Sequence, residues 1–363
     1  MRFSNIYKSV VLTVMVGVAS CFFGVSSSYA AYKKNYIGKM QDYTAVYEDT
    51  LIHLARKYDL GFIEIRAANP DLDPWIPGAG AHVVLPTRHL LPDAPRKGIV
   101  INLPEMRIYA YVNGDKAPST FPIGVGREGL STPTGKTSVI RKVVGPTWRP
   151  TERMRKADPK LPAVVPPGPD NPMGTHALYL GWPQYAIHGT NKPYGIGRRV
   201  SSGCIRMYPE NIKTFYKMIP VGTPVNVVNQ PIKVAWIGDS LYIEAHPDLE
   251  QALMMEETGA VEHQKLSDED MKKIMDVAGQ YQEFLNWPKI RTAVRERRGY
   301  PIKIAFVPGR DRKGGAIANG AKNKPLHADS ASSSSKVKEE GRVYKAADSE
   351  PDGGEKAEQP SNL

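Results

Sequence analysis

The sequence predicts a mainly β central domain, a β-sandwich or partly closed barrel, between a small α+β domain and an α+β carboxy-terminal region. Residues 99–143 carry short runs that alternate apolar and polar side chains, and turn residues such as Asn113-Gly114-Asp115 separate these runs. Alternation with a period of two is typical of all-β domains. Residues 43–86 and 232–285 instead mix strand-like runs with apolar residues at helical spacing.

The first domain is expected over residues 40–90. A strand over Tyr43–Tyr47 precedes Asp49-Thr50, which is a favourable helix start. Two amphipathic helices follow, and Asn69-Pro70 ends the second one. A final strand over His82–Leu85 completes a strand, helix, helix, strand order.

The central domain is expected over residues 97–229. Its first two strands, Ile99–Leu103 and Arg107–Val112, should each bury one face and expose the other. A short helix should begin at Pro209. Further strands are expected at Ser119–Val125, at Thr137–Val143 and, closing the domain, at Val221–Val228.

Residues 145–174 form a long segment that is rich in proline and charge and shows no periodicity. A connection of this length inside a compact domain is usually functional. We therefore expect a flap over a site, with a plain surface insertion as the alternative.

Residues 230–307 are expected to form an accessory region. Ile232–Trp236 and Leu241–Glu244 should pair as a hairpin. Ser267 should begin a helix that runs to about Leu285.

Both ends of the chain carry segments that we do not expect in the folded part. A basic stretch, an apolar run and the small-residue site Ser28-Tyr29-Ala30 make residues 1–30 resemble a signal peptide. The lipobox-like Val18-Ala19-Ser20-Cys21 leaves a lipid anchor at Cys21 as the alternative, and we favour cleavage after Ala30. Residues 308–363 contain almost no large apolar residue, which predicts a disordered tail.

The formal net charge of the chain is +11. In an exported protein, this charge favours anionic envelope material as a partner over nucleic acid. A generally basic, soluble surface is the alternative. We expect a location in the periplasm or cell envelope, no nucleic-acid partner, and membrane contact only through a lipid anchor at Cys21.

Cys204 is the only cysteine outside the first 30 residues. Exported proteins usually pair their cysteines in disulfides, so an unpaired thiol is an accident, an intermolecular bridge or a reactive group. His188 lies 16 positions earlier, at the end of a strand-like run, and a glycine-rich loop joins the two. Because an adjacent imidazole can take the thiol proton, the pair suits acyl transfer.

The neighbours of Cys204 fit the same chemistry. Gly203 should let a substrate carbonyl approach closely, and backbone N–H groups near the cysteine should stabilise an oxyanion. Arg206 should share a face with Cys204 in an extended segment and bind a substrate carboxylate. The alternative is a satisfied core histidine at position 188 and a small buried hydrophobe at position 204.

His188 and Cys204 each lie within a short motif, His188-Gly189-Thr190 and Ser201–Met207. Three further motifs occur in the same domain, and they are Ile123–Gly126, Ser131–Gly135 and Gly195–Gly197. Together they resemble the signature of L,D-transpeptidases of the YkuD family, over about residues 97–229. The resemblance implies a β-rich catalytic domain whose cysteine attacks the bond between diaminopimelate and D-Ala in a tetrapeptide stem. The acyl group would then pass through a thioester to an amine.

The resemblance implies that Cys204 is the nucleophile and His188 the general base, with a nearby backbone carbonyl orienting the imidazole. The family often has a histidine two positions before the cysteine, where this chain has Ser202. We expect orienting or oxyanion roles for Gly203, Gly189 and Ser202, and substrate contacts for Arg206, Thr190 and Tyr179. Tyr179 could equally fill the core.

Residues 43–86 resemble a LysM module through Asp49-Thr50-Leu51, Asn69-Pro70 and Leu85-Pro86. LysM domains bind glycans that contain N-acetylglucosamine, so the resemblance implies peptidoglycan binding. The alternative is a small helical packing domain with no ligand.

The expected function is therefore L,D-transpeptidation of peptidoglycan stem peptides, with a second stem or an envelope lipoprotein as the acyl acceptor. Hydrolysis by an L,D-carboxypeptidase stays open, because water and amine differ only in their access to the acyl-enzyme. A non-catalytic peptidoglycan-binding scaffold is the alternative from another class. The thioester chemistry needs no metal or organic cofactor, and a single cysteine with one nearby histidine disfavours a metal site.

Overall fold

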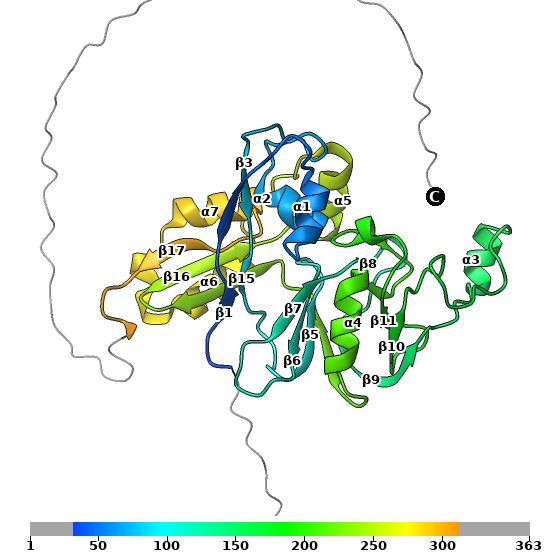
Figure 1. The fold of residues 1–363 in the computed structure, drawn as a ribbon. Coiled ribbons are helices and arrows are strands. Elements are labelled where there is room, and N and C mark those ends of the chain that lie inside the picture. The colour runs from blue at the N-terminus through cyan, green and yellow to red at the C-terminus, as the bar shows by residue number, and fades with distance from the viewer. Residues whose placement is uncertain (1–31, 312–363) are drawn as a thin grey trace, which may run out of the picture. The chain divides into compact units, whose positions relative to one another are not determined.

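The computed structural model describes residues 32–311 of the chain (Figure 1). The predicted signal peptide, the lipobox at Cys21 and the predicted tail from residue 312 onward lie outside the described residues. Within residues 32–311, no helix combines the length and the apolar character that a membrane span needs.

The N-terminal module, defined here as residues 36–90, contains four short strands and two helices (Figure 1). Both strand pairs are antiparallel. Helices α1 (Leu51–Lys57) and α2 (Phe62–Ala68) lie between the second and third strands in the chain. The pairs are β1 (Tyr36–Gly38) with β4 (Arg88–Leu90), and β2 (Gln41–Thr44) with β3 (His82–Leu85).

Local hydrogen bonds explain where these elements begin and end. The Thr50 hydroxyl accepts from the His53 N–H and begins α1, as predicted. Strand β2 ends at Thr44, earlier than predicted, because Val46 and Asp49 form a turn in which the Val46 N–H donates to the Asp49 carboxylate at 2.8 Å.

The central part is one eight-stranded mixed sheet with the strand order β13-β11-β10-β9-β14-β5-β6-β7. Helix α4 (Pro209–Met218) begins at the predicted proline and buries Ile212 and Phe215. The strands are β5 (Gly98–Asn102), β6 (Arg107–Tyr111), β7 (Ser119–Pro122), β9 (Gly135–Val144), β10 (His176–Leu180), β11 (Ala186–His188), β13 (Ile205–Arg206) and β14 (Pro224–Val228).

The chain after β7 brings the two edges of this sheet together. Gly124 and Arg206 form a backbone bridge with two N–H···O bonds of 2.9 Å. Beside this bridge, β8 (Val125–Gly126) pairs in parallel with β12 (Arg199–Ser201). Because β7 and β13 are opposite edges in the strand order, the sheet curls toward a partly closed barrel. The mainly β class is confirmed.

One expectation about the sheet is wrong. All five residues of β5 are buried, because one face packs in the main core and Val100 packs with Ile37 of the N-terminal module and with Leu91, which follows the module. The predicted closing strand, β14, lies in the middle of the sheet and runs parallel to β5. A parallel neighbour needs a crossover connection, which the intervening chain with α4 supplies.

The long segment 145–174 has local order that its lack of periodicity did not indicate. It contains the short helix α3 (Glu152–Ala157) and a bridge between Trp148 and Val165. The buried amide of Asn171 donates to the carbonyls of Pro146, Val165 and Pro166, so one side chain ties both ends of the segment together.

In the accessory region the predicted hairpin is present as β15 (Ile232–Ile237) and β16 (Ser240–Ala245). The helix that begins at Ser267 ends at Ala278, earlier than predicted, because Gly279 adopts a φ of 57°. A 3-10 turn then covers Gly279–Phe284. The helix that follows Ser267 is α6 (Asp268–Ala278). Three further elements, which the sequence did not indicate, are α5 (Leu249–Thr258), α7 (Trp287–Glu296) and β17 (Ile302–Phe306).

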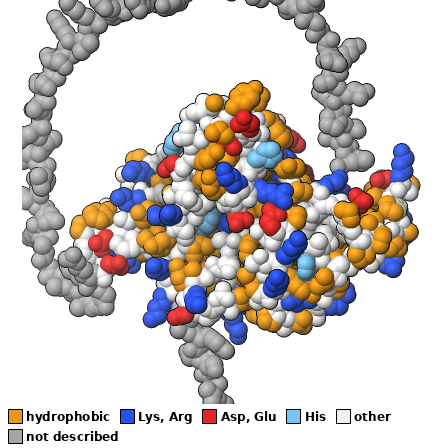
Figure 2. Space-filling model, viewed as in Figure 1, with side chains coloured by type: hydrophobic (Ala, Val, Ile, Leu, Met, Phe, Trp, Pro, Cys, Tyr) orange, Lys and Arg blue, Asp and Glu red, His pale blue; other side chains and the backbone are white. Residues whose placement is uncertain are grey.

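The surface carries charges of both signs. Figure 2 shows Lys and Arg side chains spread over the viewed face, with Asp and Glu side chains among them. Hydrophobic side chains gather at the top of this view, over the N-terminal module. Basic side chains of residues 32–311 are thus not gathered in one patch on this face.

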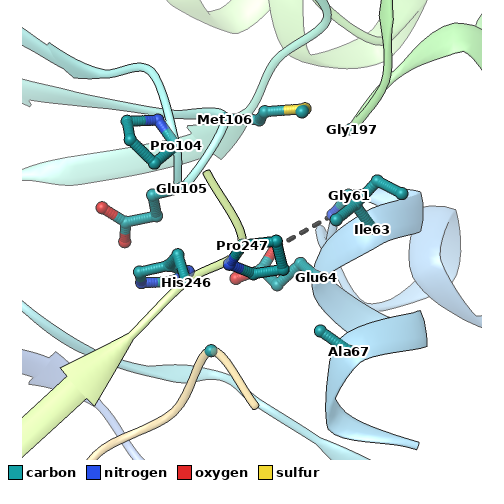
Figure 3. A pocket seen from close by; sticks show the side chains of 11 residues that line it. Gly61, Ile63, Glu64, Ala67, Pro104, Glu105, Met106, Gly197, His246 and Pro247 are labelled. Atoms are coloured by element: carbon teal, nitrogen blue, oxygen red, sulfur yellow. Dashed lines mark hydrogen bonds between the residues drawn. The ribbon is translucent and has the colours of Figure 1, made fainter. Parts of the chain in front are cut away.

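The N-terminal module, the sheet and the accessory region meet at a small cavity lined by Gly61, Glu64, Glu105, Gly197 and His246, among others (Figure 3). Neither the predicted nucleophile nor the predicted base lines it. This cavity therefore belongs to the junction between the three parts and not to the predicted chemistry.

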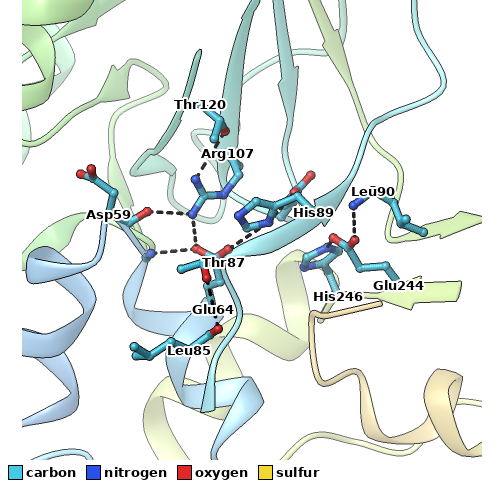
Figure 4. Close-up of polar contacts among 12 residues, drawn as sticks. Asp59, Glu64, Leu85, Thr87, His89, Leu90, Arg107, Thr120, Glu244 and His246 are labelled. Atoms are coloured by element: carbon cyan, nitrogen blue, oxygen red, sulfur yellow. Dashed lines mark hydrogen bonds and ion pairs between the residues drawn. The ribbon is translucent and has the colours of Figure 1, made fainter. Parts of the chain in front are cut away.

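Beside the cavity, seven buried ionisable residues form what we call the junction cluster. Figure 4 shows Glu64, His89, Arg107, Glu244 and His246 of this cluster. The Lys233 ammonium lies 2.8 Å from a Glu105 carboxylate oxygen and 2.7 Å from one of Glu244. Arg107 pairs with Glu64 at 2.6 Å. The cluster thus links all three parts through ion pairs, and its members are Glu64, His89, Glu105, Arg107, Lys233, Glu244 and His246.

Candidate active site

Strands β11 and β13 place the predicted catalytic residues on one face of the sheet. They run in parallel, with Ile187 opposite Ile205 and His188 opposite Arg206. Both isoleucines are fully buried in the main core, so His188 and Arg206 point to the other face. Cys204 precedes Arg206 by two residues and shares its face.

A backbone carbonyl orients the His188 imidazole. The side chain is buried, and its Nδ1 lies 2.6 Å from the Gly189 oxygen. A carbonyl only accepts, so Nδ1 carries the hydrogen and Nε2 holds the lone pair. This is the tautomer that a general base needs.

Cys204 is a free, half-buried cysteine. Its thiol donates to the Gln184 carbonyl at 3.4 Å and packs near Met173 and Ala186. Gln184 has a φ of 69°, a conformation that is uncommon outside glycine. The turn between β10 and β11 is therefore held in a strained shape that presents this carbonyl to the thiol.

Burial keeps both candidate catalytic groups, the Cys204 thiol and the His188 imidazole, neutral. Burial raises the pKa of the Cys204 thiol, against the lowering effects of the Ala186 N–H and the Arg206 charge. Burial, and then the Arg206 charge, lower the pKa of His188 to about 4, although the carbonyls of Gly189 and Met173 oppose this. Near neutral pH both the thiol and the imidazole are therefore uncharged. A reaction of this pair with a substrate would need proton transfer to accompany the attack.

The role expected for Gly203 changes in the structure. Its N–H donates to the Ser201 hydroxyl at 3.1 Å, so this N–H is not available to an oxyanion. The glycine is needed for another reason, because its φ is 108° and an added Cβ would lie 2.9 Å from a Tyr185 ring atom. Within residues 32–311 the Cys204 N–H has no hydrogen-bond acceptor, which makes it the better candidate oxyanion donor.

Of the remaining predicted residues, Gly189 contacts His188 and Thr190 stabilises the neighbouring loop. Gly189 contributes its carbonyl to His188, as an orienting residue would. Thr190 is 3% exposed, and its hydroxyl accepts from the Lys192 N–H at 3.0 Å. The Thr190 side chain is therefore enclosed and stabilises the loop, and its substrate contact stays a prediction. Ser202 is half-buried, and its hydroxyl makes no hydrogen bond in the described part of the chain.

Tyr179 lies on the face of the catalytic residues and packs in the cluster around Cys204. Two neighbours that the sequence patterns did not indicate accompany it. The Arg141 guanidinium lies 3.9 Å from the centre of the Tyr179 ring, and Trp148 of segment 145–174 joins the same cluster. The sequence placed Arg141 on a strand through the alternation along β9. It did not show that Arg141 lies opposite Tyr179, because this depends on the pairing of β9 with β10.

One group of possible metal ligands exists in residues 32–311, and it lies in the junction cluster. His89, Glu105 and Glu244 bring one ligand atom each within 4.8 Å of one another. Lys233 already pairs with both carboxylates, so its ammonium supplies the positive charge that a metal would bring. The donor set thus fits an ion-pair cluster better than a metal centre.

Comparison with known proteins agrees with this geometry. The model of the YkuD L,D-transpeptidase catalytic domain matches residues 96–227, which hold both strands of the site. The chain is 46% identical to the probable L,D-transpeptidase YcfS of Escherichia coli K12 over 209 residues, which cover 55% of this chain and 65% of that protein.

Two further relatives from Escherichia coli K12 match over more of their length. The probable L,D-transpeptidase YbiS is 40% identical over 260 residues, which cover 70% of this chain and 83% of YbiS. The probable L,D-transpeptidase ErfK/SrfK is 38% identical over 262 residues, which cover 69% of this chain and 81% of the relative. With this coverage and the catalytic-domain match, the chain belongs to the L,D-transpeptidase family of cysteine-dependent acyltransferases.

Proposed function

We propose that this chain is a peptidoglycan L,D-transpeptidase of the cell envelope, in which Cys204 forms a thioester with a tetrapeptide stem. One observation carries the proposal: Cys204, Arg206 and the oriented imidazole of His188 share a face of the sheet. The bond attacked is the one between the L-centre of diaminopimelate and D-Ala.

In the acylation half, the Cys204 thiol gives its proton to Nε2 of His188 as the sulfur attacks the carbonyl carbon of this bond. The carbonyl oxygen becomes an oxyanion that the Cys204 N–H stabilises. When the intermediate collapses, the C–N bond breaks, the proton on His188 passes to the leaving nitrogen, and D-Ala departs as an amine. The stem is then held as a thioester.

In the second half, an amine of another stem or of an envelope lipoprotein attacks the thioester. His188 takes a proton from this amine, and the C–S bond breaks as the amide forms. The sulfur leaves as thiolate and recovers the proton from His188. Water in place of the amine would give the L,D-carboxypeptidase reaction.

Arg206 supports binding of an anionic stem. Burial lowers the pKa of its guanidinium, and Arg206 forms no ion pair with a carboxylate in the described part of the chain. Its Nε is buried without a hydrogen-bond partner. A substrate carboxylate is therefore the partner that this guanidinium lacks.

We also propose that the N-terminal module binds the glycan strand, as a LysM module would. Four large apolar side chains on its connecting loops are more than half exposed, which fits stacking against sugar rings. The Leu51 N–H donates to the Pro74 carbonyl at 2.9 Å and holds the two loops together. These exposed residues are Val46, Tyr47, Trp75 and Ile76.

The decisive experiment incubates purified protein with tetrapeptide muropeptides and identifies the products by mass spectrometry. Cross-linked dimers are expected from the unmodified protein, and none from Cys204→Ala, whose fold is checked by thermal unfolding. Tripeptides with free D-Ala would instead indicate a carboxypeptidase. Equal activity in Cys204→Ala would overturn the mechanism.

A pull-down on insoluble peptidoglycan tests the glycan site separately. Trp75→Ala should reduce the bound fraction while turnover of soluble muropeptides stays unchanged. Unchanged binding of this variant would overturn the glycan role of the exposed loops.

A further inference from the structure

The loop between the two catalytic residues is held by parts of the chain outside the catalytic domain. After His188 the chain passes through residues 189–198 before β12 leads to Cys204. The N–H groups of Phe62 and Ile63, in the first turn of α2, donate to the carbonyls of Ile196 and Gly197 at 3.2 Å each. The first N–H groups of a helix have no partner within the helix, so here the catalytic loop satisfies them.

The approach of the two backbones requires glycine on both sides. Figure 3 shows Gly61 and Gly197 on facing segments. Gly197 has a φ of 76°, and an added Cβ would lie 2.3 Å from the Gly61 Cα. A Cβ on Gly61 would lie 2.8 Å from the Gly197 Cα, which is closer than real side chains come.

The accessory region holds the same loop from another direction. The Arg198 guanidinium lies 3.8 Å from the centre of the Phe62 ring and forms an ion pair with Glu256 of α5. The buried Arg199 donates to the Leu249 carbonyl, also of α5, at 2.8 Å. Residues 196–199 therefore lie between the start of α2 and helix α5.

A short path connects this clamped segment to the nucleophile. Ser201 lies two residues after Arg199 in the same strand, β12, and its hydroxyl donates to the Cys204 carbonyl at 2.5 Å and accepts from the Gly203 N–H. A shift of residues 196–199 would move Ser201 and with it the backbone around Cys204. The distance over which catalysis tolerates such a shift is below about 1 Å.

We infer that Gly61 and Arg198 are positioning residues for Cys204, so that the N-terminal module is a structural part of the catalytic site as well as a glycan binder. The inference rests on the proposed function of Cys204. It assigns the accessory region a role too, since α5 completes the clamp through Glu256 and Leu249. Removing the clamp should slow turnover even on a substrate too small to reach the glycan site.

The test compares Gly61→Ala with Gly114→Ala. Gly114 lies in the turn between β6 and β7, at the other end of the strand order, and an added Cβ there meets nothing within 4 Å. Its φ of 67° strains an alanine, so the control loses stability without touching the loop. On a soluble disaccharide-tetrapeptide, we expect kcat to fall about ten- to a hundredfold for Gly61→Ala and to stay unchanged for Gly114→Ala.

A second readout does not depend on the substrate. The rate at which iodoacetamide alkylates Cys204 is measured against pH, and Gly61→Ala should shift this profile while Gly114→Ala should not. Unchanged kcat and an unchanged profile in Gly61→Ala would overturn the inference. If the unmodified protein turned over no muropeptide, the proposed function would fail, yet the alkylation profile would still decide the positioning role.

If Gly61→Ala does not fold, two separate variants, Arg198→Gln and Glu256→Gln, replace it in the alkylation test. These changes remove the ion pair and keep the backbone contacts, so a smaller shift of the alkylation profile in the same direction is expected. A profile equal to that of the unmodified protein in both variants would again overturn the inference.

Discussion

The active site and the junction cluster are both buried, and both contain histidine, but they handle buried charge in opposite ways. In the junction cluster, Lys233 lies between the carboxylates of Glu105 and Glu244, so permanent charges neutralise one another. In the active site a carbonyl orients His188, and burial keeps both the imidazole and the Cys204 thiol uncharged. Paired charges suit a structural joint, whereas a reactive pair gains from charge that develops only during the reaction.

The largest effect is expected from His188→Asn. The asparagine amide can still donate to the Gly189 carbonyl, but it cannot accept the thiol proton. We expect kcat to fall by about two to four orders of magnitude, as for loss of a general base, with little change in the midpoint of thermal unfolding. Stopped muropeptide assays and a thermal melt measure both quantities. Turnover within a factor of about three of the unmodified protein would contradict the assignment of the base.

Lys233→Met tests how much the junction cluster contributes to stability. It leaves the carboxylates of Glu105 and Glu244 buried without their shared cation, which should lower the free energy of unfolding by about 3–5 kcal/mol. Urea unfolding measures this loss. Because Lys233 lies outside the active site, kcat per folded molecule should persist. A variant as stable as the unmodified protein would show that the cluster does not hold the three parts together.

Acid should destabilise the protein through its neutral histidines. The pKa of His188 is lowered to about 4 in the folded state, from an ordinary value of about 6.5, so the unfolded chain binds the proton first as pH falls. Stability contributed by His188 is therefore lost between about pH 6.5 and pH 4, by up to about 3 kcal/mol. His89, whose pKa burial and nearby cations also lower, adds to the same trend.

Urea unfolding at several pH values measures this slope, and His188→Asn should flatten it while the part from His89 remains. The same shift predicts that kcat/KM keeps its neutral value down to about pH 5, since the free base titrates near 4. A fall centred near pH 6.5 would contradict a buried, neutral imidazole.

The smallest effect is expected from Arg56→Gln. Arg56 pairs with Glu210 through two hydrogen bonds of 2.8 and 2.9 Å, but both side chains are well exposed. Water and salt screen such pairs, so we expect a loss of about 0.2–1 kcal/mol that fades at high salt. A loss as large as that of Lys233→Met would show that exposure does not distinguish the two kinds of ion pair.

Sequence patterns indicated the candidate catalytic residues more fully than the contacts that hold these residues in place. Cys204 and His188 stood out as candidates because they lie at fixed spacing within ordered motifs, and the pairing of β11 with β13 places His188 opposite Arg206, two residues after Cys204. The contacts of Gly203 could not be predicted from the sequence. Its N–H donates to the Ser201 hydroxyl and its φ is positive, and both depend on the shape of the folded loop. The burial of Thr190 was not predictable for the same reason, since nothing local shows that its side chain is enclosed.

The sequence by itself determined the mainly β class, the accessory hairpin, the start of α1 at Thr50, and the candidate nucleophile with its base. Each depends on residues close together in the chain, where alternation, turn chemistry and motif spacing act directly. Only the tertiary structure decided that β14 lies within the sheet and that α2 and α5 clamp the loop before Cys204. It also decided that Lys233 of the accessory region pairs with Glu105 of the central domain and donates to the Leu90 carbonyl of the N-terminal module. These contacts join residues far apart in the chain, and their partners are set by packing, which no local pattern encodes.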